Sequence, residues 1–301
     1  MHQNTAERGH TKAKILIEAL PYIRHFYGKT IVIKYGGHAM VDEDLKRDFV
    51  LDIILMKYVG IHPVIVHGGG PQISRIMKRM GITPNFIEGQ RVTDDETMNV
   101  VEMVLVGTVN KDIVGLINKH GGKAVGMSGR DGDLIQAEPM KIYRYSGDAR
   151  PPEILDIGRV GKVKQVNSEI LQALEQADFI PVIAPVGVGP EGQAYNINAD
   201  LVAGAIAGRL KATKLVLLTD VSGLKDKEGS LITSITTGGA KQLVDNGTAQ
   251  GGMIPKLKAC MKALKQGVEK AHIIDGRKSH AILLELFTDS GVGTEIRHDP
   301  G

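Results

Sequence analysis

The sequence predicts an α/β protein, a three-layer αβα sandwich with one mainly parallel central sheet. Short runs of Val, Ile and Leu alternate with amphipathic stretches along most of the chain, and glycine-rich segments directly follow two of the early runs. Such alternation favours parallel strands joined by helices that cover both faces of the sheet. The 301 residues are 42% hydrophobic and 24% charged, which is enough to build one or two cores. Ligands of such a sheet gather at the carboxyl ends of its strands.

An N-terminal helix precedes the first strand. Its apolar residues recur at helical spacing over residues 11–27, and Pro21 should bend it. In chain order we then expect strands at 30–35 and 63–67, helices at 45–59 and 72–80, a long helix at 94–120, hairpins along a sheet edge over 121–166, a strand at 179–186, a Gly-rich hairpin, a helix at 200–210, a strand at 215–220 and helices near Ala240, Pro255 and Ala281.

Two further features refine this outline. The form Thr93-x-x-Glu96 predicts a capping box at the start of the long helix. The weakest seam in the pattern lies at residues 211–213, between two elements. We therefore expect an N-terminal helix at 1–28 that serves oligomerisation or regulation, one lobe at 29–211 and a second lobe at 212–301.

Composition excludes several classes of protein. The chain carries 37 Lys and Arg against 34 Asp and Glu, interspersed along its length, so a nucleic-acid partner is not expected. The longest uncharged apolar stretch, which begins at Phe179, has two prolines and is too short to span a membrane. A single cysteine, Cys260, fits a reducing compartment, and we expect a cytoplasmic protein. No H-E-x-x-H or P-loop motif occurs, so we expect no resident metal.

Two glycine-rich loops are candidates for anion binding. Gly36 and Gly37 follow the first strand, residues 68–70 follow the second, and a helix comes after each loop. Without a Cβ, backbone N–H groups can approach an anion, and the helix N-terminus adds partial positive charge. Tight turns between strand and helix are the simpler explanation for either loop alone. Two such loops at neighbouring strand ends favour a shared phosphate or carboxylate site.

Four charged residues stand where they could complete this site. Lys34 closes the first strand just before the glycines, and Lys256 lies in the first turn of a helix after the loop at 247–255. Asp200 begins a helix, either as a plain N-cap or as a carboxylate that holds the lysines. Arg91 could bind a substrate carboxylate or pair with one of the aspartates that follow it. A solvated edge lysine and an ordinary basic helix start are the simpler alternatives for Lys34 and Lys256.

Seven segments, in order and over nearly the whole chain, resemble the amino-acid kinase family, in particular the enzymes that act on N-acetyl-L-glutamate. They are IVIKYGG (31–37), VHGGGPQI (66–73), RVTD (91–94), VNKDIV (109–114), YNINAD (195–200), LLTDVSGL (217–224) and GGMIPK (251–256). The resemblance implies a carbamate kinase-like fold. It also implies transfer of the γ-phosphoryl group of MgATP to the side-chain carboxylate, which gives N-acetyl-L-glutamyl 5-phosphate in the second step of arginine biosynthesis.

The resemblance assigns roles to individual residues. Lys34 and Lys256 would act on the transferred phosphoryl group from two sides, with Asp200 orienting both. Substrate-binding residues would be Gly68, Gly69, Gly70, Arg91 and Asn196; ATP-binding residues would be Gly36, Gly37, Thr219, Asp220, Gly223, Leu224, Gly251 and Gly252. Mg²⁺ would be carried on the ATP phosphates. A carboxylate acceptor with a pKa of about 4.3 is ionised at neutral pH and needs no general base, which agrees with the absence of a recognisable Ser, Cys or His catalytic motif.

The N-terminal helix resembles that of the arginine-inhibited, hexameric members of the family. By this resemblance we expect a homo-oligomer, a hexamer built as a trimer of dimers through residues 1–28, with L-arginine as inhibitor. Tyr22, His272 and Glu285 are the expected arginine contacts. An amphipathic helix with no place in a doubly wound sheet has to bury its apolar face elsewhere, which also favours a subunit contact.

Three other functions compete with this interpretation. A kinase of the same fold could act on glutamate, aspartate, carbamate or a nucleoside monophosphate, but the segments at 91–94 and 195–200 argue against it. A catalytically silent arginine sensor would not need both lysines together with Asp200. An NAD-dependent oxidoreductase depends on the G-x-G-x-x-G match at 187–192, which contains Pro190 and is followed by a strand-like segment instead of a helix.

Overall fold

An eight-stranded sheet forms the centre of the molecule. The computed structural model describes residues 2–144, 153–289 and 291–299. The strand order is β14-β16-β15-β13-β1-β2-β10-β5. The bounds are β1 Thr30–Tyr35, β2 His62–His67, β5 Ala124–Ser128, β10 Ile180–Ala184, β13 Lys214–Thr219, β14 Ser234–Thr236, β15 Lys270–Asp275 and β16 Gly293–Arg297. The pairing of β16 with β15 is antiparallel and the other pairings in this sheet are parallel, so the predicted, mainly parallel sheet is confirmed.

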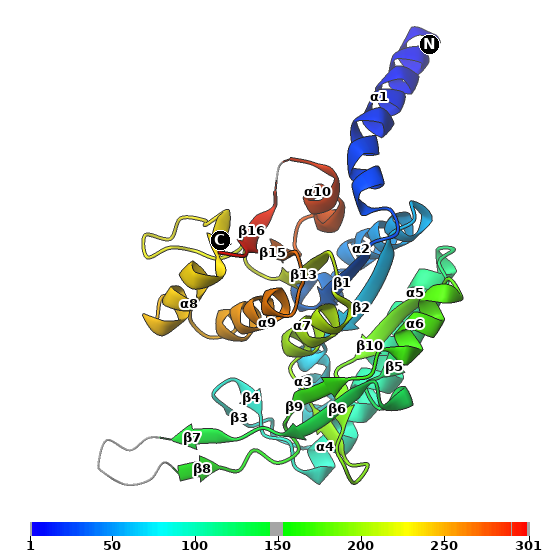
Figure 1. Cartoon of the computed structure of the whole chain (residues 1–301). Helices are drawn as coiled ribbons and strands as arrows, with labels where there is room; N and C mark the ends of the chain where they lie inside the picture. Colours follow the sequence, from blue (N-terminus) through cyan, green and yellow to red (C-terminus); the bar gives the residue numbers. More distant parts are fainter. Residues whose placement is uncertain (1, 145–152, 290, 300–301) are drawn as a thin grey trace.

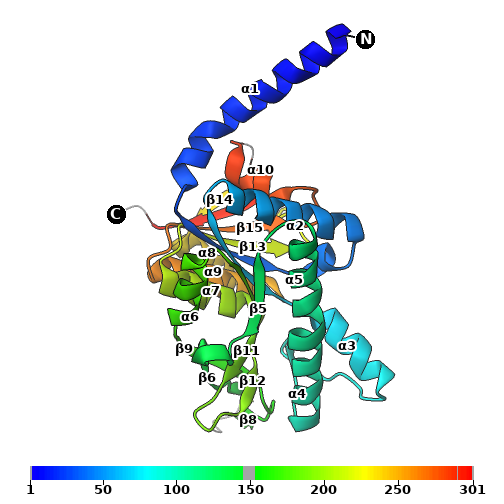
Figure 2. The same ribbon diagram turned by 90° about the vertical axis from the view of Figure 1, so that its right-hand side faces the viewer.

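Helices cover both faces of this sheet (Figures 1 and 2). One face packs against α2 (Glu43–Tyr58), α5 (Asn110–Lys119) and α10 (Ala281–Phe287), and the other against α6 (Glu169–Gln176), α7 (Ala199–Leu210) and α9 (Met253–Lys265). Side chains alternate between the faces along β1, because Ile31 and Ile33 belong to the first core and Val32 to the second. The same alternation directs Lys34 toward α7 and α9.

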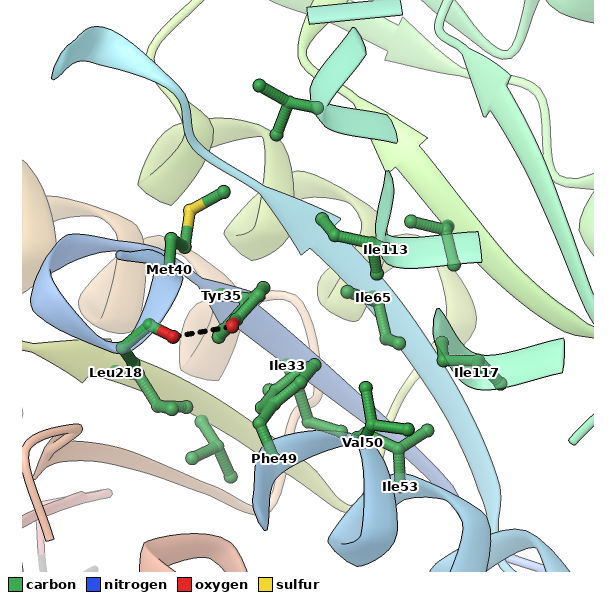
Figure 3. Packing of buried hydrophobic residues seen from close by; sticks show 14 of the residues in the cluster. Ile33, Tyr35, Met40, Phe49, Val50, Ile53, Ile65, Ile113, Ile117 and Leu218 are labelled. Atoms are coloured by element: carbon green, nitrogen blue, oxygen red, sulfur yellow. Dashed lines mark hydrogen bonds between the residues drawn. The ribbon is translucent and has the colours of Figure 1, made fainter. Parts of the chain in front are cut away.

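The core under α2 is well packed (Figure 3). The rings of Tyr35 and Phe49 are stacked with centroids 3.7 Å apart. The other labelled residues are Ile33, Met40, Val50, Ile53, Ile65, Ile113, Ile117 and Leu218, from the sheet, α2, α5 and the 3₁₀ turn Gly37–Met40. Each large apolar side chain buried in this way contributes about 1.5–3 kcal/mol to the free energy of unfolding. The packing therefore holds the ends of the strands in fixed positions.

A second, smaller sheet lies beside the carboxyl ends of β2 and β10 (Figure 1). Its order is β12 (Ala194–Asn196), β11 (Val186–Val188), β6 (Ile135–Pro139) and β9 (Gly161–Val166). The hairpin of β7 (Ile142–Arg144) with β8 (Glu153–Leu155) lies between β6 and β9 in the chain, and a separate hairpin of β3 (Phe86–Ile87) with β4 (Gln90–Arg91) lies between α3 and α4. The prediction of edge hairpins over 121–166 was therefore only partly right. β5 is an edge strand of the main sheet, whereas β6 pairs with β9 and also with β11 of a later hairpin, which local sequence cannot reveal.

The predicted long helix is continuous but changes type along its length. It consists of α4 (Asp95–Glu102), a π-helical segment at Met103–Val109, and α5. The predicted capping box is wrong, because Asp94 is the N-cap and accepts the Thr97 N–H at 2.8 Å. Thr93 donates its hydroxyl to the Arg91 carbonyl instead. The π-helical segment places Asn110 in the interior, at the start of α5.

The N-terminal helix α1 (His2–Phe26) extends away from the rest of the molecule (Figure 1). It begins nine residues before the predicted start at residue 11, and its axis turns in the part that contains Pro21 (Figure 2). Its exposed apolar side chains are Ile15, Leu16, Ile17 and Leu20. The remaining helices are α3 (Gly70–Arg79), α8 (Thr237–Asp245) and the 3₁₀ turn Asp131–Asp133. Among the described residues no helix has the length and apolarity needed to cross a membrane.

Candidate active site

Lys34, Asp200 and Lys256 meet at the carboxyl end of β1, although they lie on three different elements. The Nζ atom of Lys34 is 3.3 Å from Oδ1 of Asp200, and the Nζ atom of Lys256 is 2.7 Å from Oδ2. Helices α7 and α9 come close enough for this because Gly204 has no side chain, and a Cβ there would lie 2.9 Å from the Ala259 carbonyl oxygen. Two ammonium groups therefore flank one carboxylate.

The burial of these groups determines their charges. Asp200 is only 5% exposed and Lys34 only 9%. Burial alone would raise the pKa of Asp200, but the two ammonium groups outweigh it and hold the pKa below its ordinary value. Burial lowers the pKa of Lys34, and the attraction of Asp200 offsets this only in part. The carboxylate therefore stays ionised and holds the two cations in place at neutral pH.

Asp200 is not the N-cap of α7, so the simpler alternative for this residue was wrong. The N-cap is Asn198, whose side-chain oxygen accepts the N–H groups of Asp200 at 2.9 Å and Leu201 at 3.3 Å. Sequence reasoning missed Asn198 although its spacing before the helix is a capping signal. Because Asn198 satisfies the helix end, the carboxylate of Asp200 is free to hold the lysines.

The two glycine loops lie side by side, as predicted. A Cβ on Gly68 would lie 3.9 Å from the Gly36 Cα, and a Cβ on Gly36 would lie 2.6 Å from the Lys34 Nζ. Gly37 has a φ of +77° and a Cβ there would collide with the carboxylate of Asp220. Glycine is thus required here by close approach as well as by backbone conformation. The loops and the Lys34 ammonium border one space.

The loop at 68–70 differs from the expectation in one respect. The Gly68 N–H donates to the Tyr35 carbonyl at 2.8 Å, so it is not free to bind an anion. Neither Gly69 N–H nor Gly70 N–H has an acceptor within the described residues. The loop then continues directly into α3, whose N-cap is Gly69. Two donors at a helix N-terminus therefore remain for a ligand, in place of the three expected.

Arg91 is buried next to this loop. Its guanidinium donates to the Gly70 carbonyl at 3.1 Å and to the Ser74 hydroxyl at 2.8 Å, and burial lowers its pKa. No carboxylate lies within 4.0 Å of it in the described part of the chain. The alternative in which it pairs with Asp94 or Asp95 is therefore wrong, since Arg159 takes Asp95 instead.

Asn196 on β12 reaches the same region through Thr93. Its side-chain amide donates to the Thr93 hydroxyl at 3.2 Å. Thr93 in turn donates to the Arg91 carbonyl at 2.7 Å. The structure thus connects Arg91 and Asn196, which sequence reasoning had placed on the same substrate.

Gly36 and Gly37 follow β1, and the other predicted ATP-binding residues fall on two loops of the C-terminal part. Thr219 ends β13, and Asp220 accepts the backbone N–H of His38. Gly223 and Leu224 lie against β16, where the Thr294 hydroxyl accepts the Leu224 N–H at 2.8 Å. Gly251 and Gly252 precede α9, and a Cβ at either would meet open space. These two glycines, Asp200 and Lys256 line an open cavity of about 1510 Å³, which also has Lys141 and Lys162 on its wall.

The lysines at 141 and 162 were not singled out from the sequence. Lys162 comes from β9 and Lys141 directly precedes β7. Lys162 pairs with Glu138 at 3.0 Å, and Glu138 lines the same cavity. The charged run in which each stands resembles any solvated strand face, so no local signal identifies them. No group of three or more His, Cys, Asp and Glu side chains that could hold a metal ion occurs within residues 2–144, 153–289 and 291–299.

The three expected arginine contacts lie near the base of α1. Tyr22 donates its hydroxyl to Asp289 at 2.6 Å. The Nδ1 atom of His272 is 2.7 Å from Glu285, and Lys214 is 3.9 Å from the same carboxylate oxygen. His272 and Glu285 are therefore in direct contact between β15 and α10, while Tyr22 contacts the segment that follows α10.

Residues 29–275 match the Amino acid kinase family, and the chain belongs to this family. It is 60% identical to the acetylglutamate kinase of Syntrophus aciditrophicus (strain SB) over 293 residues, which are 97% of this chain and 99% of that relative. It superimposes with a TM-score of 0.82 and 26% identity on the N-acetylglutamate synthase of Neisseria gonorrhoeae, solved with coenzyme A and N-acetyl-glutamate.

That alignment covers 96% of this chain but only 64% of the longer synthase. The carbamate kinase of Giardia lamblia bound to AMP-PNP shares the fold with a TM-score of 0.60 at 17% identity, over 90% of this chain and 99% of that one. The family and the carbamate kinase-like fold predicted from the sequence are thus confirmed.

Proposed function

We propose that this protein transfers the γ-phosphoryl group of ATP to the side-chain carboxylate of N-acetyl-L-glutamate and forms N-acetyl-L-glutamyl 5-phosphate for arginine biosynthesis. The convergence of Lys34 and Lys256 on Asp200 carries this proposal, because it puts two cations beside glycine-loop N–H donors. The 60% identity to an acetylglutamate kinase over nearly the full chain supports the choice of acceptor. The single buried thiol agrees with reaction in the cytoplasm.

The residues supply positioning and charge, which is what phosphoryl transfer to a carboxylate requires. The acceptor carboxylate is already ionised, so no side chain has to remove a proton. Both reactants are anionic, and the ammonium groups of Lys34 and Lys256 would offset their repulsion while charge moves to the leaving phosphate. Asp200 keeps the ammonium groups pointed at one place. Donors fixed before the reaction act without the cost of reorganisation.

Mg²⁺ fits this site only as an ion bound to the phosphates of ATP. Asp200 is engaged by two lysines, and no group of three or more His, Cys, Asp and Glu side chains that could hold a metal ion occurs among the described residues. A magnesium ion bound to the ATP phosphates would neutralise part of their charge. The protein would contribute the lysines and the loop amides around it.

We also propose that the two lobes bind different substrates. Residues 29–211 carry Arg91, Asn196 and the loop at 68–70, which would bind N-acetylglutamate. Residues 212–301 carry the loops at 219–224 and 251–252, which would bind ATP together with Gly36 and Gly37 of the first lobe. The central sheet runs through both lobes, from β5 to β14. The transferred group would then lie between the lobes, next to Lys34.

The direct test is a trapping assay. The purified protein is incubated with MgATP and N-acetylglutamate, and acyl phosphate is captured with hydroxylamine, with glutamate and aspartate as controls. We expect hydroxamate only with N-acetylglutamate. Equal product with aspartate or glutamate, or none with N-acetylglutamate, would reject the proposed acceptor.

We further propose that arginine inhibits the enzyme and that α1 joins subunits into a hexamer. The exposed apolar residues of α1 at 15–17 and 20 support a subunit contact. Tyr22, His272 and Glu285 surround the base of α1, where a bound arginine would affect its orientation. Deleting residues 1–26 should abolish the hexamer in analytical ultracentrifugation and weaken inhibition by arginine. A hexamer that survives the deletion would contradict this role of α1.

A further inference from the structure

His67 is an unusual residue in the second strand. It is fully buried, and it directly precedes the glycine loop at 68–70. Its Nδ1 atom is 2.8 Å from the Gly68 carbonyl oxygen, which can only accept a hydrogen bond, so Nδ1 carries the proton. Its Nε2 atom is 3.2 Å from the side-chain nitrogen of Asn110. Burial lowers the pKa of His67 to about 4, so the ring is neutral at physiological pH.

Asn110 is held in one orientation. Its side-chain nitrogen also donates to the Val182 carbonyl at 2.9 Å, so the amide nitrogen, rather than the oxygen, faces His67. Gly126 on β5 makes room for this amide, because a Cβ there would collide with the Asn110 oxygen. The preceding π-helical segment, a feature frequent at functional sites, delivers Asn110 to this position. Asn110 therefore fixes the tautomer and the orientation of the His67 ring.

The planar peptide between Gly68 and Gly69 transmits this orientation to the loop. In a trans peptide the carbonyl and the following N–H point in opposite directions, and this peptide is trans. With its carbonyl held against the buried His67 ring, the Gly69 N–H is directed away from the ring. Gly69 N–H has no acceptor in the described residues, and the loop borders Gly36 and the Lys34 ammonium.

We propose that His67 and Asn110 are positioning residues that turn the Gly68–Gly69 peptide so that the Gly69 N–H donates to the transferred phosphoryl group. This inference rests on the proposed kinase activity and names the device that sets one of its donors. A histidine that only satisfied its own hydrogen bonds in the core would affect stability and leave turnover unchanged.

Two substitutions at His67 test the inference. His67→Asn keeps an N–H group near the position of Nδ1, whereas His67→Leu removes it. Loss of one preorganised donor costs about 100- to 1,000-fold in kcat, and a donor that is misaligned rather than lost should cost less. For His67→Leu we expect kcat to fall by about tenfold or more with the KM for N-acetylglutamate nearly unchanged. His67→Asn should restore kcat to within about threefold of the wild type.

Asn118→Leu is the matched control, because Asn118 also lies on α5 and donates to and accepts from the backbone of Ala124, away from the loop. It should lower the melting temperature but leave kcat unchanged. Asn110→Ala gives a second measurement if His67→Leu does not fold, and its kcat should fall at constant KM.

The inference is overturned by wild-type kcat in His67→Leu or, where that variant does not fold, in Asn110→Ala. It is also overturned if His67→Asn is as slow as His67→Leu, or if Asn118→Leu is equally slow. Failure of the kinase proposal is seen separately, as a wild-type protein that does not phosphorylate N-acetylglutamate.

Discussion

Replacing Lys34 by methionine should lower turnover by about two to three orders of magnitude while the fold persists. Methionine keeps an unbranched side chain of similar length in the interior and removes the ammonium group, with its charge and its hydrogen-bond donors. Asp200 retains Lys256 at 2.7 Å, so the carboxylate is not left without a partner. The transferred phosphoryl group loses the cation on the side of the glycine loops. The substitution therefore separates the catalytic role of this lysine from its structural role.

The structure sets the expected size of both effects. At 3.3 Å and an effective dielectric constant of about 20, the attraction between Lys34 and Asp200 is about 5 kcal/mol. Removing an ammonium from water costs several kcal/mol, so the two terms nearly cancel, which agrees with the lowered pKa of Lys34. We expect the free energy of unfolding to change by less than about 2 kcal/mol. In contrast, kcat should fall by about 100- to 1,000-fold, or about 3–4 kcal/mol.

The hydroxylamine assay gives kcat, and urea unfolding gives stability. Lys57→Met is a matched control, since the Lys57 side chain is 12% exposed and pairs with Asp178 at 2.8 Å, whereas the Lys34 side chain is 11% exposed. The control should keep full activity, because Lys57 lies at the opposite end of α2 from the site. A Lys34→Met protein that folds and retains kcat near that of the wild type would refute the assignment.

Three more predictions concern the Lys34–Asp200–Lys256 group and the contact between His280 and Asp52. Gly36→Ala should cost at least about tenfold in kcat at an unchanged urea midpoint, because the new Cβ displaces the Lys34 ammonium while Gly36, with a φ of −177°, has extended backbone; full activity would contradict it. Asp200→Asn should lower both kcat and the unfolding free energy, the latter by about 3–5 kcal/mol, since the buried Lys34 and the partly buried Lys256 lose their counter-charge; a stable variant would argue against this. His280→Gln removes the contact between the His280 Nδ1 and the Asp52 carboxylate, which are 2.6 Å apart. This hydrogen bond raises the pKa of His280, and burial raises the pKa of Asp52 to about 6. A raised histidine pKa gives stability that is lost as the pH rises through that pKa. The difference in urea midpoint between the wild type and His280→Gln should therefore be largest near about pH 6–7 and smaller at about pH 5 and pH 8.5. A difference that does not change with pH would contradict an ion pair between His280 and Asp52.

Sequence reasoning was strongest where the signal was local. The strand at 30–35 and its glycine pair were recognised because apolar alternation and glycine are properties of a few neighbouring residues. It failed, or left alternatives open, where a distant partner decided the outcome. The Gly68 N–H, expected to be free for an anion, is occupied by Tyr35 of the neighbouring strand. The choice between a substrate carboxylate and a nearby aspartate for Arg91 was left open, and the structure excludes the aspartate because Arg91 contacts Gly70 and Ser74.

The order of strands and helices, the glycine loops and the residue types able to handle a phosphoryl group were determined by the sequence alone. Only the tertiary structure decided that Lys34, Asp200 and Lys256 meet, because this depends on which face of β1 packs against α7 and α9. The neutral tautomer of His67 likewise depends on Asn110, which a different element brings to it. Local pattern fixes what each segment can form, whereas packing fixes which side chains share a space.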